Sequence, residues 1–285
     1  MRASVRGVEL FFDVDGAALV PDGSGMRVRP TIILVHGGPG TDHTAWKRRY
    51  AGLERAYQLV YFDQRGHGRS SSADPSSYTL EENVEDLEAL RKYLGLQKVV
   101  TLGGSYGGMV AMAHAARYPQ AVSHLILACT AAHSGYFARA KEIVELRGTR
   151  EQVEMFGAML GGKLDDQEKI AKYFAVMGSL YSNSAPKDGD PPQEEIAFGV
   201  EAFNNAYRPG GFLRSFDLRP ELERIDAKTL ILAGRHDWIC PPEFSEELNL
   251  IIPGSALQIF ERSGHSLGVD ARDEFIRAVS NFLAN

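Results

Sequence analysis

Short apolar runs alternate with helical stretches through the first half of the chain, and this alternation constrains the fold more than any other feature. The runs are mostly apolar, which is typical of strands buried on both faces of a sheet. They span residues 31–35, 59–62, 99–102 and 124–128. Helices are expected between them at about 46–56, 79–94 and 106–117, the second beginning with a capping box of Thr79 and Glu82. The pattern predicts an α/β fold with a mostly parallel, doubly wound sheet.

The strand pattern stops near residue 130 and resumes near residue 220. Between these points helical stretches are interrupted by a polar segment rich in proline and glycine at 182–192. Strands are again expected at 229–232 and 257–260, followed by an amphipathic helix over 271–283. We therefore expect a core domain made of residues 1–129 and 220–285, and an inserted helical cap at 130–219.

Composition excludes several classes of partner. The chain has 285 residues and a formal net charge of -6, so strong binding to nucleic acid or to an anionic membrane is not expected. No apolar run approaches the roughly 18 residues of a membrane span. The two cysteines, Cys129 and Cys240, are in no metal-ligand or redox spacing. We expect a cytoplasmic protein with a small-molecule substrate and with no metal or cofactor; its oligomeric state cannot be read from the sequence.

The segment Gly103-Gly104-Ser105-Tyr106-Gly107 fits the pattern Gly-x-Ser-x-Gly and lies between an expected strand and an expected helix. In that context the pattern predicts a sharp, strained turn that exposes a nucleophilic serine at the carboxyl end of the sheet. The flanking glycines are needed because a side chain would crowd this turn.

A serine hydroxyl needs a base to remove its proton and an acid to orient that base. Asp237 follows the strand expected at 229–232, and His265 follows the one at 257–260. The order Ser, Asp, His along the chain is that of α/β hydrolases. The sequence thus predicts a catalytic triad of Ser105, Asp237 and His265.

The loop His36-Gly37-Gly38-Pro39-Gly40 directly follows the buried strand at 31–35. Exposed backbone N–H groups there can stabilise the oxyanion of an acyl-transfer reaction. We expect Gly38 to supply one donor and Tyr106, the residue after the nucleophile, to supply the other.

These segments, together with Asp63-Gln64-Arg65-Gly66-His67-Gly68-Arg69-Ser70, resemble the proline iminopeptidase family of α/β hydrolases. The resemblance covers the first 120 residues and the two loops of Asp237 and His265, and it is weak across the expected cap. It implies the same triad, and it implies that the turn at 63–70 is mainly structural.

The expected cap departs from that family. Members that release an N-terminal proline hold its ammonium group with cap glutamates, and Asn204 stands where one such glutamate is expected. An asparagine brings no negative charge to a buried ammonium group. Glu194, Glu195 and Glu201 are possible substitutes, although their spacing is also that of a solvated helix face.

The leading hypothesis is therefore a serine hydrolase that cleaves a small carboxylic ester, lactone or amide through an acyl-serine intermediate. Proline iminopeptidase activity is the main alternative; hydrolysis of a C–C bond and a non-catalytic receptor role also stay open. The residues expected to contact the substrate are Gly37, His43, Trp46, Tyr136, Phe137, Glu201, Asn204 and Trp238.

Overall fold

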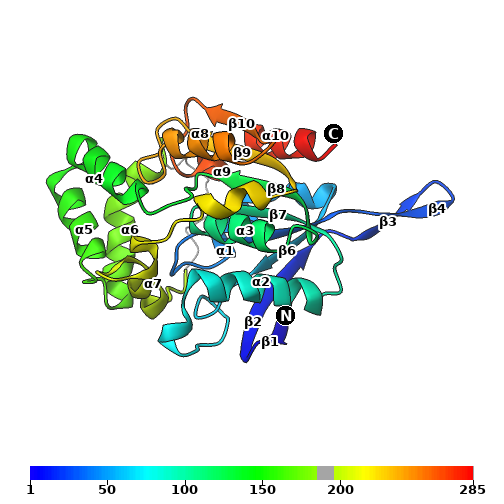
Figure 1. The fold of residues 1–285 in the computed structure, drawn as a ribbon, viewed down its shortest axis with the longest axis horizontal. Helices are drawn as coiled ribbons and strands as arrows, with labels where there is room; N and C mark the ends of the chain where they lie inside the picture. Colours follow the sequence, from blue (N-terminus) through cyan, green and yellow to red (C-terminus); the bar gives the residue numbers. More distant parts are fainter. Residues whose placement is uncertain (185–195, 285) are drawn as a thin grey trace.

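An eight-stranded sheet forms the centre of the computed structural model, which describes residues 1–184 and 196–284 (Figure 1). The order across the sheet is β1-β2-β6-β5-β7-β8-β9-β10. β1 and β2 pair antiparallel, as do β2 and β6, and the remaining pairs are parallel. The strands are β1 (Arg2–Val5), β2 (Val8–Asp15), β5 (Thr31–Val35), β6 (Gln58–Phe62), β7 (Val99–Gly104), β8 (Val122–Ala128), β9 (Lys228–Gly234) and β10 (Ala256–Phe260). The predicted α/β fold with a mostly parallel sheet is confirmed.

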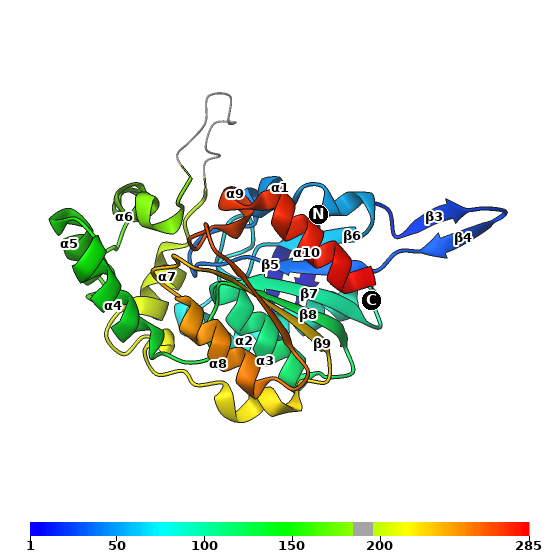
Figure 2. The same ribbon diagram turned by 90° about the horizontal axis from the view of Figure 1, so that it is seen from above.

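Helices cover both faces of the sheet, as Figure 2 shows most clearly. One face carries α2 (Leu80–Tyr93), α3 (Tyr106–Arg117) and α8 (Pro242–Ile251). The other carries α1 (Thr44–Tyr50), α9 (Leu267–Asp270) and α10 (Arg272–Ala284). Short 3-10 turns connect these elements at Leu53–Arg55, Pro75–Ser77, Phe212–Arg214 and Arg219–Arg224.

Strand β5 explains how two hydrophobic layers arise from one sheet. Ile33 and Val35 belong to the layer beneath α2 and α3, whereas Ile32 and Leu34 belong to the layer beneath α1 and α10. Successive side chains of a strand point to opposite faces, so a strand covered on both sides must be apolar throughout. All five residues of β5 are buried.

Two local expectations need correction. The helix expected at 46–56 ends at Tyr50, because Gly52 has a φ of +118° and separates α1 from the 3-10 turn that follows. At the start of α2, Thr79 accepts a hydrogen bond from the Glu82 N–H at 3.2 Å, which is half of the expected capping box. The Glu82 carboxylate instead pairs with Arg6 and Arg65.

In the described residues, four α-helices lie between β8 and β9, in the stretch where the sequence predicts the cap. They are α4 (Tyr136–Arg147), α5 (Arg150–Leu160), α6 (Gln167–Tyr181) and α7 (Val200–Tyr207). Figures 1 and 2 place them together beyond the carboxyl ends of the parallel strands. We call α4 to α7 the insertion helices.

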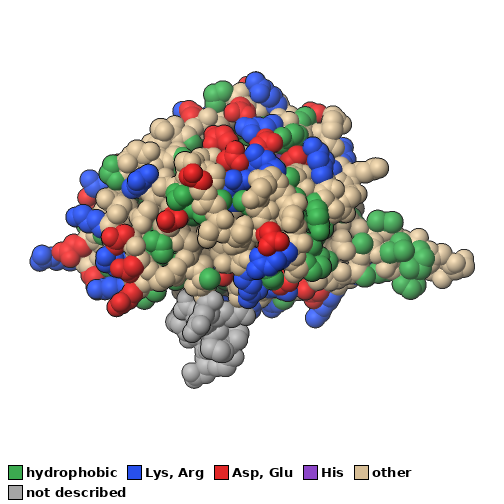
Figure 3. All heavy atoms as spheres, turned by 90° about the horizontal axis from the view of Figure 1, so that it is seen from below, with side chains coloured by type: hydrophobic (Ala, Val, Ile, Leu, Met, Phe, Trp, Pro, Cys, Tyr) green, Lys and Arg blue, Asp and Glu red, His purple; other side chains and the backbone are tan. Residues whose placement is uncertain are grey.

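A separate hairpin, β3 (Leu19–Asp22) and β4 (Gly25–Val28), projects from the opposite end of the molecule (Figure 1). Its hydrophobic side chains are the green group at the right of Figure 3, where Leu19, Met26 and Val28 are 52%, 58% and 73% exposed. Where the hairpin leaves the core, the Arg29 N–H donates to the Ala18 carbonyl at 2.7 Å.

Among the described helices, none is long and apolar enough to cross a membrane.

Candidate active site

Ser105 lies at the junction of β7 and α3 in a strained backbone conformation, with φ 54° and ψ -128°. Its N–H donates to the carbonyl oxygens of Ala128 at 3.0 Å and Cys129 at 3.2 Å, and its own carbonyl accepts from the Thr130 hydroxyl at 2.7 Å. A non-glycine residue persists at positive φ only when its surroundings hold it there. The end of β8 supplies that support.

The flanking glycines are required by close backbone contacts. A Cβ atom on Gly103 would lie 2.2 Å from the Gly107 carbonyl oxygen, and one on Gly107 would lie 2.0 Å from the carbonyl oxygen of Val35. No side chain fits at these distances. The same contacts press the start of α3 against the end of β5, and this brings the serine turn next to the loop that follows β5.

The loops after β9 and β10 pack directly on each other. The His236 N–H donates to the Ser263 carbonyl at 2.9 Å, and a Cβ on Gly234 would lie 2.0 Å from the Gly264 carbonyl oxygen. Because β9 and β10 are parallel neighbours, their carboxyl ends meet at one edge of the sheet. Asp237 and His265 therefore face each other although 28 residues separate them.

The pair they form is geometrically complete. Nδ1 of His265 lies 2.7 Å from Oδ2 of Asp237, whose other oxygen accepts from the N–H groups of Ile239 at 2.9 Å and Cys240 at 3.0 Å. The Asp237 side chain is fully buried. A carboxylate held in this way keeps the imidazole proton on Nδ1 and leaves Nε2 as the basic nitrogen.

Two residues that the sequence analysis missed hold the His265 loop. The Asp270 carboxylate accepts from the Gly264 N–H at 2.7 Å and the Ser184 N–H at 3.0 Å. Burial opposes ionisation of Asp270, but these and further hydrogen bonds outweigh it and lower its pKa. The backbone carbonyl of Tyr181, the last residue of α6, accepts from the Ser266 N–H at 2.9 Å. The Tyr181 ring centroid lies 5.4 Å from that of His265.

The loop after β5 lies against the serine. A Cβ on Gly37 would come within 3.2 Å of the Ser105 Cβ and 3.8 Å of its Oγ. Gly38 has a φ of +114°, which a residue with a side chain rarely adopts. Tyr106 is the first residue of α3, where backbone N–H groups have no acceptor within their own helix.

His36 braces this loop from below. Its Nδ1 lies 2.8 Å from the Gly37 carbonyl, and its Nε2 accepts from the Gln64 N–H at 3.1 Å. Burial lowers the pKa of His36, so the ring is neutral and its two nitrogens take opposite hydrogen-bonding roles. The imidazole thus fixes the loop rather than serving as a base.

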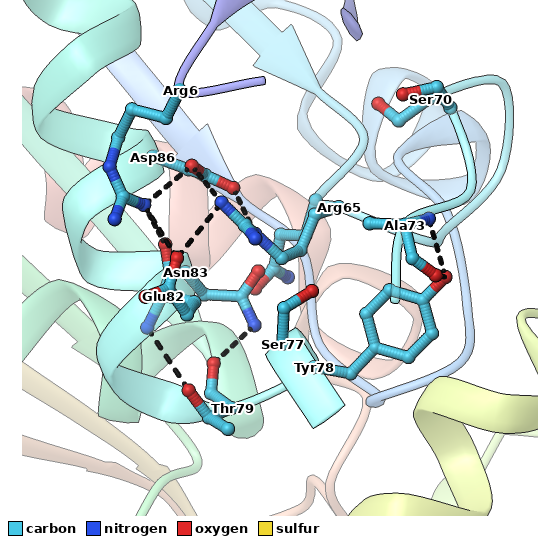
Figure 4. Close-up of polar contacts among 12 residues, drawn as sticks. Arg6, Arg65, Ser70, Ala73, Ser77, Tyr78, Thr79, Glu82, Asn83 and Asp86 are labelled. Atoms are coloured by element: carbon cyan, nitrogen blue, oxygen red, sulfur yellow. Dashed lines mark hydrogen bonds and ion pairs between the residues drawn. The ribbon is translucent and has the colours of Figure 1, made fainter. Parts of the chain in front are cut away.

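The turn at 63–70 is anchored by ion pairs to α2, which Figure 4 draws in full. Two nitrogens of Arg65 each lie 2.6 Å from a different oxygen of the buried Asp86, and Arg6 pairs with the same carboxylate at 2.9 Å. From the next turn of α2, the Asn83 amide donates to the Tyr106 hydroxyl at 2.8 Å. These bonds connect the turn and α2 to Tyr106, the residue that follows Ser105.

His43 belongs to the same supporting structure. Its Nδ1 lies 2.6 Å from Oδ1 of Asp63, whose carboxylate also accepts from the Arg69 N–H at 2.8 Å. Burial would raise the pKa of Asp63, but the hydrogen bonds from His43 and from the Arg69 N–H help to outweigh it, and the pKa is lowered to about 2. His43 therefore lies behind the site, where it positions the loop between β5 and α1.

A cavity of about 1390 Å³ opens over the serine, between the carboxyl edge of the sheet and the insertion helices. Of the residues predicted at the site, the structure brings seven to its wall: Ser105, His265, Gly37, Gly38, Tyr106, Trp46 and Tyr136. Such a volume exceeds the roughly 300–1,000 Å³ of many ligand pockets.

The other predicted contact residues do not line this cavity. Trp238 is buried between the rings of Phe156 and Tyr181, and the Asn204 amide donates to the Leu164 carbonyl at 2.7 Å. Phe137 packs on Tyr207 and beneath Arg214. Glu201 is exposed at the start of α7, and Glu194 and Glu195 lie outside the described residues.

Helix α7 holds the loop after β5 from above. The Tyr207 hydroxyl donates to the Gly38 carbonyl at 2.6 Å, and the Gly199 N–H donates to the Gly40 carbonyl at 3.0 Å. A Cβ on Gly40 would lie 2.7 Å from the Cβ of Phe203. The sequence analysis missed Tyr207 because its partner is 169 positions away.

In the described part of the chain, one group of potential metal ligands has all its ligand atoms within 4.8 Å of one another, namely Cys129, Asp237 and His265. Burial and the nearby Asp237 charge raise the pKa of the Cys129 thiol well above its usual value. A protonated thiol is a poor ligand, and Asp237 and His265 already satisfy each other. This arrangement suits acid–base chemistry better than metal binding.

Comparison with known proteins identifies the family to which this fold belongs. Residues 30–271 match the family described as alpha/beta hydrolase fold. The chain is 33% identical over 282 residues to the proline iminopeptidase PfmaB of Pestalotiopsis fici, covering 96% of this chain and 98% of that one.

Two solved structures share the fold over nearly their whole length. One is a proline iminopeptidase from Mycobacterium smegmatis, with a TM-score of 0.77, 20% identity and coverage of 100% and 97%. The other is an enol-lactonase from Burkholderia xenovorans, with a TM-score of 0.70, 23% identity and full coverage of both chains. The predicted resemblance is thereby confirmed, and the chain belongs to the α/β-hydrolase family, as a hydrolase related to the proline iminopeptidases.

Proposed function

We propose that this protein is a serine hydrolase that cleaves a carboxylic ester or lactone through an acyl-serine intermediate. The observation that carries the proposal is the pair of His265 with the buried Asp237, because His265 lines the same cavity as Ser105. The strained backbone of Ser105 agrees with this role, because strain of this kind is characteristic of nucleophile turns.

In the acylation step the Ser105 Oγ attacks the substrate carbonyl while Nε2 of His265 takes the hydroxyl proton. Asp237 stabilises the imidazolium that forms without itself becoming protonated. The backbone N–H groups of Gly38 and Tyr106 stabilise the developing oxyanion, each such donor contributing about 2.7–4 kcal/mol to the transition state. His265 then gives its proton to the leaving oxygen, and the acyl-serine remains.

Deacylation runs through the same groups. His265 removes a proton from a water molecule as the water attacks the acyl carbonyl, and the proton passes to the Ser105 Oγ as the acyl–oxygen bond breaks. The insertion helices act as a cap over the cavity in this proposal. They select the substrate and position the loop that carries Gly38.

Release of an N-terminal proline is the second candidate, supported by the names of the relatives. That activity requires the cavity to hold an ammonium group, and a buried ammonium needs a negatively charged partner. Asn204 is neutral and bonded to a backbone carbonyl, and Glu201 is exposed. Neither of these two side chains supplies the required charge within the described residues, and this favours the ester or lactone.

The test is turnover of para-nitrophenyl butyrate, an acyl homoserine lactone and proline para-nitroanilide by the wild type and by Ser105→Ala. We expect ester or lactone turnover that falls by about 10⁴ to 10⁶ in the variant. Ser24→Ala, which removes a hydroxyl from the exposed hairpin turn, is the matched control and should retain full activity. Ester turnover that survives in Ser105→Ala would refute the proposal, and anilide cleavage would favour the second candidate.

A further inference from the structure

The wall of the cavity formed by α1, α9 and the start of α10 is cationic. Arg48, Arg49 and Arg272 all line the cavity. The Asp42 carboxylate also lines it, but its two oxygens accept from the Thr44 N–H at 2.8 Å and the Ala197 N–H at 3.2 Å. Positive side chains gather here although the chain as a whole carries a net charge of -6.

Arg49 is the member of this group that lies against the loop of the general base. A Cβ atom on Gly268, three residues after His265, would lie 2.8 Å from the Cβ of Arg49 and 3.4 Å from its Cγ. The ring of Tyr50, the next residue of α1, also packs close to Gly268. The aliphatic stem of Arg49 is therefore fixed between α1 and α9, and the side chain contributes to the cavity wall.

One nitrogen of the Arg49 guanidinium, Nε, is buried and has no hydrogen-bond partner within the described residues. Buried donors are nearly always paired in folded proteins, so an unpaired one calls for an explanation. Arg65, by contrast, has an Asp86 oxygen at each of two nitrogens.

The position of Arg49 in its helix does not supply the missing acceptor. It stands in the last turn of α1, where the helix dipole favours a cation. Burial nevertheless lowers the pKa of Arg49, and the neighbouring charge of Arg48 lowers it further. Within the described residues the charged form is thus poorly compensated, and it would be stabilised by an anion from the substrate.

We propose that Arg49 is a binding residue for a carboxylate carried by the substrate, so that the enzyme prefers esters or lactones with a distal carboxylate over neutral ones. The two terminal nitrogens of a guanidinium match the two oxygens of a carboxylate, so the contact does not require the buried Nε. This inference rests on the proposed hydrolase function and narrows its substrate class. It also gives a physical reason why this cavity disfavours the ammonium group of a peptide.

The test compares two para-nitrophenyl esters that differ only at the far end, the monoester of adipic acid and its methyl ester. The quantity measured is the ratio of kcat/KM for the anionic ester to kcat/KM for the neutral one. We expect this ratio to fall at least about tenfold in Arg49→Gln, equivalent to about 1.4 kcal/mol. Arg49→Lys, which keeps the positive charge but loses the paired donors of the planar guanidinium, should give an intermediate ratio.

Arg55→Gln is the matched control, since it removes the same charge from an exposed residue that does not line the cavity. It should leave the ratio unchanged. Circular dichroism establishes that each variant is folded; if Arg49→Gln is not, the Arg49→Lys ratio decides. A ratio in the folded Arg49 variant within twofold of the wild-type value overturns the proposal.

A binding measurement separates this inference from the proposed chemistry. Monomethyl adipate is titrated calorimetrically into Ser105→Ala and into Ser105→Ala combined with Arg49→Gln. Saturable binding that weakens at least tenfold in the double variant supports the carboxylate site, even if no ester is turned over. Equal binding by both proteins, or binding by neither, overturns it.

Discussion

At the scale of single residues, two buried imidazoles determine how the protein responds to acid. They lie beneath the loop after β5, which we call the oxyanion loop after its proposed role. The His67 ring lies 5.4 Å from that of His36, and both are buried. Burial, reinforced by the proximity of His36, lowers the pKa of His67 to about 3. The folded protein therefore keeps His67 neutral at a pH where the unfolded chain binds a proton.

This difference makes stability fall as the pH drops from about 6.5, the pKa of histidine in an unfolded chain, towards 3. In that window His67 contributes a slope of up to about 1.4 kcal/mol per pH unit to the free energy of unfolding. His67→Asn keeps a donor for the Arg65 carbonyl, which His67 Nδ1 approaches at 2.7 Å, and removes the titration. We expect the free energy of unfolding, measured with urea from pH 6.5 to 4, to depend less steeply on pH in this variant. An unchanged pH dependence would contradict this account.

Residue types and local spacing were enough to select Ser105, Asp237 and His265 as candidates, because each follows an apolar strand and has a recognisable neighbourhood. Asp270 and Arg49 have no such local signal. Their roles depend on neighbours brought together by folding, such as Ser184 for Asp270 and Gly268 for Arg49. Spacing along the chain carries no information about contacts of this kind.

At the scale of elements, α7 connects the insertion helices to the oxyanion loop. We expect Tyr207→Phe to lower kcat for para-nitrophenyl butyrate about three- to tenfold, because the Gly38 carbonyl loses the donor that fixes its peptide group. Loss of this partly buried hydrogen bond also costs about 0.5–1.5 kcal/mol of stability. Steady-state kinetics, with kcat and KM determined separately, measure the first effect. Thermal unfolding measures the second.

A matched control is available for this substitution. Tyr93→Phe removes a phenol hydroxyl from a side chain that is 54% exposed at the end of α2, and it should change neither quantity. If Tyr207→Phe alters the melting temperature and leaves kcat at the wild-type value, α7 only stabilises the loop and does not tune its chemistry.

Sequence periodicity predicted the sheet strands from β5 onward and the helices α2, α3 and α10 to within a few residues. These elements are long or continuously apolar, so the pattern is decisive. It did not separate α1 from the turn at 53–55, where Gly52 interrupts a helical pattern, and it did not reveal the hairpin β3–β4. A hairpin with both faces exposed has no buried face to impose an alternation.

At the scale of the whole molecule, that hairpin contributes little to the core. All four residues of β4 are exposed, and the two strands pair with each other in a sheet of their own. We expect replacement of residues 19–28 by Asn-Gly to leave the melting temperature within about 2 °C and ester turnover unchanged. The existing bond from the Arg29 N–H to the Ala18 carbonyl then becomes the closing bond of a two-residue turn.

Calorimetric melting and turnover of the shortened chain test this expectation. A large fall in the melting temperature would mean that Leu19, Met26 or Val28 is covered in solution, for instance by another molecule. A normal melting temperature with lost activity would mean that the hairpin affects turnover in the cavity at the far end of the sheet.

The paired ends of the hairpin also make it a suitable site for inserting another domain. Ala18 and Arg29 lie next to each other, joined by a backbone hydrogen bond. A domain whose own termini lie close together can therefore be inserted between them without disturbing the core. A fluorescent domain there would point away from the cavity and the insertion helices. The enzyme could then be immobilised or tracked by a handle remote from its chemistry.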